Sequence, residues 1–311
     1  MVGRDAARAT PVGGPRPHAG LERTPTVEPV VIGASRPCAA LAFAGALTLG
    51  TTPTPAAVVG EELVGPAYGP PADATLEATV GILGGLAPDY PGSDDYRLIP
   101  APYVHGSYRE IVFVRGSQLG LNALRLGSRR EGFGFRAGAI AALDPGRDTD
   151  ANDAVDSLDD VDFGVEVGGF AELAYLFAAL RLEARREVAG GHGGVVVDLV
   201  SEFSLPLTSW LRVDLEVGTR WADADYMAAY FGVTPGQAAI TGLAAHDPGA
   251  GVTSVDVLLG ATYFLTESWL LRVQGAYGRL LGDAADSPIV DDKGSPNQFF
   301  IGLGGAYRFA F

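Results

Sequence analysis

The sequence predicts an all-β chain that folds as an antiparallel transmembrane β-barrel, and three observations lead to this prediction. Apolar and polar residues alternate in one stretch after another, which is the two-residue period of a strand. On the polar faces of the predicted strands, arginines lie beside acidic residues, and the chain has a single lysine, Lys293. Short and long connections alternate along the chain, as in membrane barrels. A two-layer sandwich also alternates, but its polar face meets water and usually carries many Lys, Thr and Ser residues.

The pattern predicts twelve strands. They are expected at 76–87, 96–107, 109–116, 118–126, 132–143, 162–174, 176–187, 194–206, 210–222, 251–265, 269–281 and 298–311. Merging the third and fourth strands would give an odd count and break the alternation of connections, so twelve is favoured and ten is the alternative. A tilted strand of about 10 residues crosses an apolar band of about 25 Å.

The connections predict an orientation. If both ends of the barrel domain are periplasmic, short turns at 107–110, 127–131, 174–176, 206–210 and 266–269 share the periplasmic side. The mostly long connections at 88–95, 144–161, 187–194, 222–251 and 282–297 then lie outside. Short periplasmic turns with longer outer loops are typical of the outer membrane.

The residues before the barrel suggest an export signal. Residues 1–35 are expected to be a disordered extension or a mis-assigned start, and 36–57 resemble a signal peptide with a basic residue, a short apolar run and small residues. The apolar run is too short to span a bilayer as a helix. A linker is expected at 58–75 and the barrel at 76–311. The one cysteine, Cys38, would be removed with the signal.

The net charge of −15 argues against a nucleic-acid partner. Charged strand residues fall on the row opposite the apolar one and are expected to face the lumen. They are Glu166, Glu172, Arg181, Glu183, Arg185, Asp198, Glu202, Arg212, Asp214, Glu216, Arg220, Asp256, Arg272 and Arg308. If they pair across strands they fill the barrel, whereas separate acidic and basic walls would leave a narrow path for ions or solutes.

Two outer loops have recognisable chemistry. The 144–162 segment is rich in Asp, but its spacing does not match an EF-hand. It is expected to be a solvated acidic loop, with loose divalent binding shared with lipopolysaccharide as the alternative. In the 222–251 loop, Thr234 and Pro235 predict the start of a short helix. This loop would either fold into the barrel mouth or lie at its rim.

No catalytic, cofactor or metal site is expected, and the protein is predicted not to be an enzyme. His18 precedes the mature chain, and His192 and His246 lie in loops. His105 and Ser107 share a strand face, as a barrel phospholipase would need. They lie near a periplasmic turn, however, and that chemistry belongs at the outer rim.

The last strand ends in alternating aromatic residues, Tyr307, Phe309 and Phe311. It resembles the closing strand of bacterial outer-membrane barrels, which implies that these residues form the signal read by the barrel-assembly machinery. Three further stretches, at 87–97, 226–238 and 279–290, resemble the MipA/OmpV family of outer-membrane proteins, the MltA-interacting proteins. The more specific residues are Tyr230, Phe231, Gly232, Val233, Asp283, Asp286, Ser287 and Pro288. Thr241 departs from the family, which more often has Ser there.

The resemblance implies a barrel in the outer membrane of a Gram-negative bacterium, surrounded by lipid and lipopolysaccharide. It also implies a possible scaffold that holds a murein transglycosylase near a peptidoglycan synthase. The docking surface of such a scaffold would be the periplasmic turns, around Arg109, Arg129 and Arg130. The alternatives are a narrow channel or stress-responsive permeability protein, and a surface adhesin that uses the loops at 144–161 and 222–251.

Overall fold

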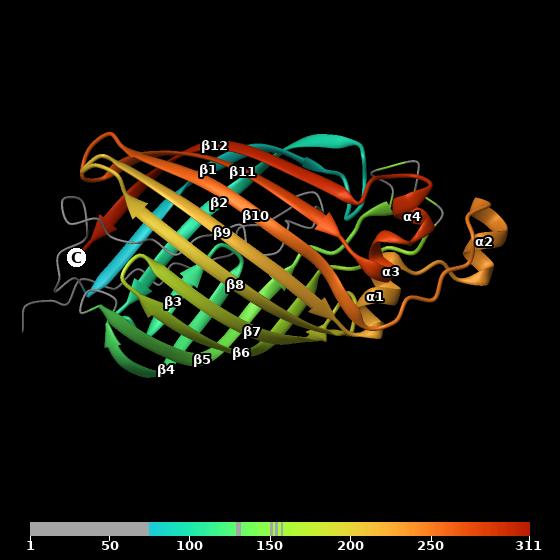
Figure 1. Ribbon diagram of the computed structural model, residues 1–311, viewed down its shortest axis with the longest axis horizontal. Coiled ribbons are helices and arrows are strands. Elements are labelled where there is room, and N and C mark those ends of the chain that lie inside the picture. The colour runs from blue at the N-terminus through green and yellow to red at the C-terminus, as the bar shows by residue number, and fades with distance from the viewer. Residues whose placement is uncertain (1–74, 129–131, 150–151, 153–154, 157) are drawn as a thin grey trace, which may run out of the picture. The chain divides into compact units, whose positions relative to one another are not determined.

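Twelve antiparallel strands close into one barrel, in which β1 pairs with β12 (Figure 1). The computed structural model describes residues 75–311 apart from 129–131, 150–151, 153–154 and 157. The expected extension and signal peptide lie outside the described residues. The strands are β1 (Leu76–Pro88), β2 (Tyr96–Tyr108), β3 (Val112–Arg115), β4 (Gln118–Ser128), β5 (Phe133–Asp144), β6 (Gly164–Tyr175), β7 (Ala178–Ala189), β8 (Val195–Pro206), β9 (Leu211–Ala222), β10 (Gly251–Phe264), β11 (Trp269–Leu280) and β12 (Asn297–Ala310).

The predicted count of twelve is confirmed, and the alternative of ten is wrong. The third strand is much shorter than the expected 109–116. Arg109 and Glu110 both have a φ of 52° and therefore belong to the turn before β3. The remaining residues, Val112–Arg115, still pair with β2 on one side and β4 on the other. This short strand keeps the count even, so the chain can close on itself.

The closing seam brings the first and last strands into close approach. Gly81 faces Ala306 across the seam, and a Cβ on Gly81 would collide with the Gly305 carbonyl oxygen. Glycine allows the two backbones to approach here. The backbone N–H of Phe311 donates to the Leu76 carbonyl at 3.0 Å, so the last residue completes the ladder.

The barrel wall is apolar outside and charged inside. In β9, Leu215 and Val217 are exposed, whereas Arg212, Asp214 and Glu216 are each 3–4% exposed. In a water-soluble fold this arrangement would be inverted. Lipid hydrocarbon around the barrel accommodates the outward-facing apolar side chains. Closure of the sheet leaves no unpaired strand edge exposed to the lipid. Aromatic rings cluster on the outer face near the chain end, where Tyr307 packs edge-on against Trp269 at 5.0 Å between ring centroids.

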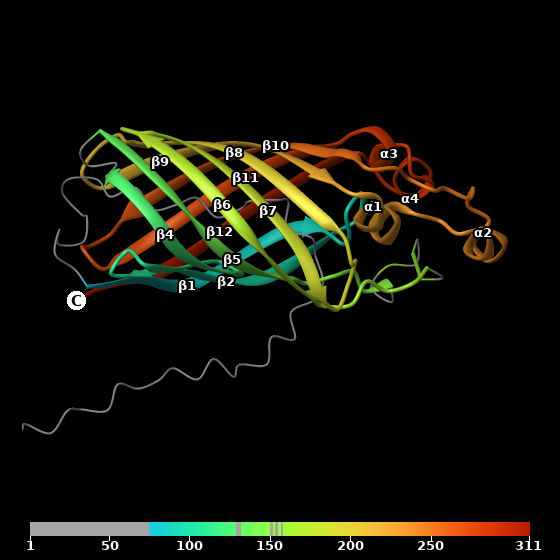
Figure 2. The same ribbon diagram turned by 90° about the horizontal axis from the view of Figure 1, so that it is seen from below.

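Short turns join the strands at the end of the barrel that carries Phe311, which we call the turn end. Long connections and the four helices of the described residues lie at the opposite end, the loop end (Figure 2). The helices are α1 (Ala224–Phe231), α2 (Pro235–Thr241), α3 (Gly282–Ala285) and α4 (Pro288–Asp291). No helix in the described part of the chain is long and apolar enough to cross a membrane.

Candidate functional site

The charged residues expected in the lumen lie in the barrel interior. Twelve of the fourteen are at most 8% exposed, and Arg220 and Asp256 are half-buried. Burial of an ionised group is costly unless a counter-charge and hydrogen bonds compensate it. The partners of these charges therefore decide whether the interior is filled or forms an open path.

Arg185, on β7, is the hub of the larger ion-pair network. Its three guanidinium nitrogens donate to three carboxylates: Nε to Glu166 at 2.8 Å, Nη1 to Glu183 at 2.6 Å and Nη2 to Asp198 at 2.7 Å. Asp198 also accepts from Nε of Arg220 at 2.8 Å. Each of these charges is therefore neutralised locally.

The network also crosses the lumen. Glu183 on β7 accepts from Arg115 on β3 at 3.0 Å and from Gln118 on β4 at 2.9 Å. These strands are not neighbours in the sheet, so both bonds span the interior. Arg115 was not among the expected lumen charges, although its strand was expected at 109–116.

A smaller network lies between β9, β10 and β11. Asp214 accepts from Nη1 of Arg272 at 2.9 Å, and Nε of Arg212 lies 3.2 Å from its other oxygen. The Arg272 guanidinium also donates to Thr262 at 3.0 Å. Arg308, nearer the turn end, donates to the backbone carbonyl of Glu267 at 2.6 Å. The two networks together keep basic and acidic groups mixed along the interior.

One interior carboxylate is an exception. Glu216 is 3% exposed, and neither of its oxygens has a hydrogen-bond partner among the described residues. It faces Glu202 directly across the β8–β9 ladder. Two facing carboxylates repel one another, so this pair opposes folding unless a proton is shared.

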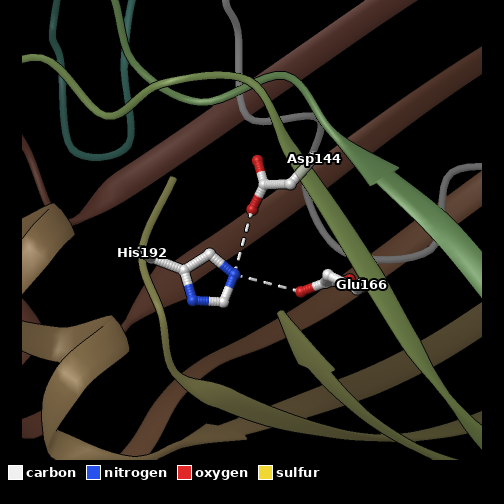
Figure 3. A group of neighbouring side chains, drawn as sticks. All are labelled: Asp144, Glu166 and His192. Carbon is white, nitrogen blue, oxygen red and sulfur yellow. Dashed lines mark hydrogen bonds and ion pairs between the residues drawn. The ribbon is translucent and has the colours of Figure 1, made fainter. Parts of the chain in front are cut away.

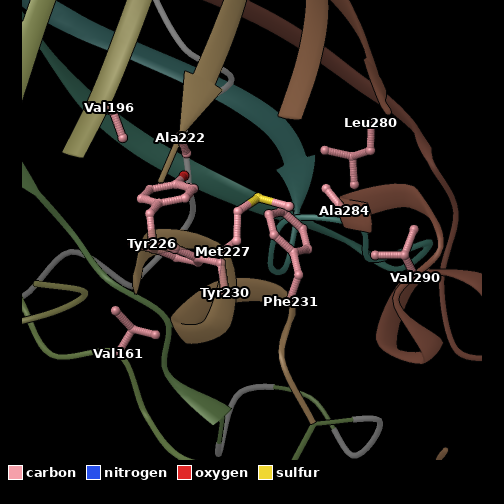
Figure 4. Packing of buried hydrophobic residues seen from close by; sticks show 10 residues of the cluster. All are labelled: Val161, Val196, Ala222, Tyr226, Met227, Tyr230, Phe231, Leu280, Ala284 and Val290. Carbon is pink, nitrogen blue, oxygen red and sulfur yellow. The ribbon is translucent and has the colours of Figure 1, made fainter. Parts of the chain in front are cut away.

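A hydrophobic cap covers the interior at the loop end. Its centre is α1, whose Tyr226, Met227, Tyr230 and Phe231 are each at most 6% exposed (Figure 4). The other members of this cluster come from the strand ends, the 144–161 loop, α3 and α4: Val161, Val196, Ala222, Leu280, Ala284 and Val290. Side chains from several connections between residues 161 and 290 therefore close the mouth.

The family stretches meet in this cap. The Ser287 hydroxyl donates to the Phe231 carbonyl at 2.7 Å, which joins two stretches that are 56 residues apart. Tyr90, from the first stretch, is 1% exposed and packs in a second buried cluster with Val233 and Ile289. Gly232 and Pro288 lie beside these contacts in the chain, while Asp283 and Asp286 are exposed.

Polar contacts anchor the cap to the barrel. Arg147 is 3% exposed and donates to the carbonyls of Tyr230 at 2.8 Å and Asp159 at 2.9 Å. Burial raises the pKa of Tyr226 to about 12. Burial, followed by the nearby Asp144 carboxylate, raises the pKa of Tyr230 as well. Tyr230 is therefore a protonated donor at neutral pH, and its hydroxyl bonds Asp144 at 2.8 Å.

One part of the 222–251 loop folds into the barrel mouth and another part stays exposed, so both of the expected arrangements occur. The helix expected after Thr234 is confirmed as α2, with a reciprocal capping box between Thr234 and Gln237. None of the α2 residues is buried, so this helix does not fill the mouth. That position belongs to α1, which sequence reasoning missed. The residue in the sequence that could have indicated the start of α1 is Asp223, whose side chain accepts a hydrogen bond from the Tyr226 amide as an N-cap.

The acidic loop and the histidines differ in part from expectation. Asp156, Asp159 and Asp160 are exposed as expected, but Val155 and Leu158 of the same loop are buried in the cap. His105 is 6% exposed and packs against the Tyr103 ring. His192 lies in a loop as expected, the β7–β8 connection, but its side chain is completely buried among carboxylates. The residues Asp150, Asp153, Arg129 and Arg130 lie outside the described ranges.

The fold and interior together define a class: a membrane-spanning β-barrel with a charge-paired lumen and a cap over one mouth. The family model of the MltA-interacting protein MipA matches residues 80–309. The chain therefore belongs to the MipA family, as the resemblance implied.

Similar proteins are outer-membrane barrels. Outer membrane protein OmpV of Vibrio cholerae is 35% identical over 92 residues, which are 30% of this chain and 34% of OmpV, so the alignment spans about a third of that relative. Among solved structures, the NanC porin has a TM-score of 0.43 at 9% identity and covers 73% of this chain and 98% of its own. An outer membrane channel from Pseudomonas putida F1 has a TM-score of 0.41 at 14% identity, covering 80% and 100%. This chain is a β-barrel protein of the Gram-negative outer membrane.

Proposed function

We propose that this protein is a non-enzymatic structural barrel whose turn end serves as a docking surface for a murein transglycosylase. The observation that carries the proposal is the cross-lumen bonding of Glu183 to Arg115 and Gln118 beneath the α1 cap. A barrel whose interior is filled by its own ion pairs is suited to holding a fixed position and shape. The partner follows from the family, which is named for interaction with MltA.

The alternative, a narrow conducting path, needs interior charges that separate into walls or leave unpaired groups along the axis. Here basic and acidic groups alternate, and Arg185 alone neutralises three carboxylates. Planar-bilayer recording of the purified protein tests this point. We expect no stepwise currents from the wild-type protein. Stepwise currents from the wild-type protein would favour the channel instead.

Docking is proposed at the turn end because we place that end in the periplasm, where murein lies. Arg109 projects from the β2–β3 turn and is exposed. Its charge reversal, Arg109→Glu, has a matched control in Lys293→Glu, because Lys293 is an exposed cation at the loop end. Binding of a purified murein transglycosylase to the nanodisc-embedded barrel measures both variants.

We expect Arg109→Glu to weaken binding by about tenfold, which corresponds to about 1.4 kcal/mol, and Lys293→Glu to leave it unchanged. The reverse result would place the docking surface, and the periplasm, at the loop end. Equal binding by both variants and the wild type would remove electrostatic docking at Arg109 from the proposal.

An adhesive role at the loop end is the second candidate, and α2 favours it. This helix buries none of its residues, and Ile240 is 75% exposed on it. An apolar side chain held out from the barrel on a capped helix suits contact with an external surface. Deletion of 235–241 is expected to reduce surface attachment of cells that display the protein, and unchanged attachment would eliminate this role.

A further inference from the structure

Three potential metal ligands meet beneath the cap at the loop end (Figure 3). Asp144 ends β5, Glu166 lies near the start of β6, and His192 comes from the β7–β8 connection. The Nε2 atom of His192 lies 3.2 Å from Oε1 of Glu166 and 3.4 Å from Oδ2 of Asp144. All three ligand atoms lie within 4.8 Å of one another.

These separations suit a small tetrahedral cation. Zinc binds histidine nitrogen and carboxylate oxygen at about 2.0–2.1 Å, which puts neighbouring ligands of a tetrahedron about 3.3 Å apart. The two measured separations, 3.2 and 3.4 Å, bracket that value. Calcium fits poorly because it takes about 6–8 oxygen ligands, and an imidazole is not one. Among divalent cations, a nitrogen ligand beside carboxylates favours zinc or a similar transition metal.

In both carboxylates, one oxygen accepts hydrogen bonds from neighbouring groups and the other oxygen faces His192. Oε2 of Glu166 accepts from Nε of Arg185 at 2.8 Å, which leaves Oε1 facing the histidine. Oδ1 of Asp144 accepts from the Tyr230 hydroxyl at 2.8 Å and the Gly146 amide at 2.9 Å, which leaves Oδ2 facing the histidine. Outer partners of this kind orient the ligands of a metal and raise its affinity.

The histidine ring is fixed on its remaining sides. The Tyr226 ring packs edge-on against it, with 4.8 Å between centroids. The Gly194 amide donates to Nδ1 at 3.0 Å, which assigns the ring proton to Nε2, between the two carboxylates. A cation at that position replaces the proton, which moves to Nδ1. Oε2 of Glu187, 3.7 Å away, is then the acceptor for Nδ1 in place of the Gly194 contact.

We propose that Asp144, Glu166 and His192 form a Zn²⁺ site, with water in the fourth position, that locks the loop end of the barrel. The ion ties together β5, β6 and the β7–β8 connection, and it reaches α1 through the bond between Asp144 and Tyr230. Because each ligand comes from a different segment, zinc binding and closure of the cap stabilise one another.

The test uses the full chain purified in detergent, stripped with chelator and titrated with ZnCl₂ by calorimetry. We expect one equivalent to bind, and Asp144→Asn and His192→Gln each to weaken binding at least tenfold. Glu187→Gln changes only the outer partner of the ring and is expected to weaken binding about tenfold. The control is Asp156→Asn, which removes an exposed carboxylate of the same loop and should bind as the wild type does.

Two results would overturn the proposal. One is a wild-type protein that binds no zinc, or binds it no better than Asp144→Asn. The other is an equal loss in Asp156→Asn, which would assign binding to the acidic loop surface. If His192→Gln fails to fold, X-ray absorption of the zinc-loaded wild type decides the matter. One imidazole nitrogen with oxygens at about 2.0 Å supports the site, and a shell of oxygens alone refutes it.

Discussion

The change of Arg185 to Met tests whether the interior ion pairs hold the barrel together. Arg185 is 5% exposed and bonds Glu166, Glu183 and Asp198 at 2.6–2.8 Å. Methionine keeps much of the side-chain length while removing the charge. Removal of one partner of a buried ion pair costs about 3–5 kcal/mol, because the other charge stays buried without compensation.

The structure places the expected loss at the lower end of that range, at about 3 kcal/mol. Each of the three carboxylates keeps another donor. Glu183 retains Arg115 at 3.0 Å, Asp198 retains Arg220 at 2.8 Å, and Glu166 retains His192 at 3.2 Å. None of these carboxylates is therefore left fully uncompensated.

The assay is urea unfolding of the barrel in lipid vesicles, followed by tryptophan fluorescence. Trp221 and Trp269 lie on the lipid-facing wall and Trp210 lies in the β8–β9 turn next to it, at 38–53% exposure, so their emission reports insertion. The control is Arg125→Met, which removes a surface pair with Glu110 at 2.8 Å. Both of its partners are solvent-accessible, and a loss below about 1 kcal/mol is expected. Equal losses in the two variants, or a loss below 1 kcal/mol for Arg185→Met, would refute the reasoning.

Three further predictions concern single groups. Glu216→Gln is expected to raise the free energy of unfolding in the same urea assay by about 1 kcal/mol, because the wild-type carboxylate is buried without a hydrogen bond from any described residue; a loss of stability would show that an ionised Glu216 is needed. Ser287→Ala removes the bond to the Phe231 carbonyl and should cost about 1–3 kcal/mol of cap stability, read as faster proteolysis of the loop end while the strands stay protected; unchanged proteolysis would contradict the link. The hydroxyl and amide of Thr149 hold the pKa of Asp160 below its ordinary value, so this contact stabilises the loop above the unfolded pKa and is lost as pH falls through the folded one. Thr149→Val removes the hydroxyl donor and keeps the amide donor, so it should reduce that part of the pH dependence of loop proteolysis, and an unaltered pH profile would exclude the hydroxyl as its source.

Much of the fold could be predicted because the alternation along each strand is a local property. Arg212, Asp214 and Glu216 sit on one row of β9, and that row can face only one side of the sheet. The candidate site was less predictable. His192 stands among glycines, with no periodic pattern around it, and its carboxylate neighbours lie 26 and 48 residues earlier in the chain. Nothing in the local sequence indicates that these groups meet.

The sequence by itself determined the approximate strands, their two faces, the even number of strands and the membrane setting. The reason is that the alternation of apolar and polar residues and the spacing of turns are local properties of the sequence. Only the tertiary structure decided which charges pair. Arg115 reaches Glu183 because the curvature of the closed barrel lets side chains of the non-adjacent strands β3 and β7 meet in its interior. It also decided that α1 closes the mouth and that His192 lies buried beneath it. Contacts between side chains far apart in the chain depend on curvature and closure, which no local pattern specifies.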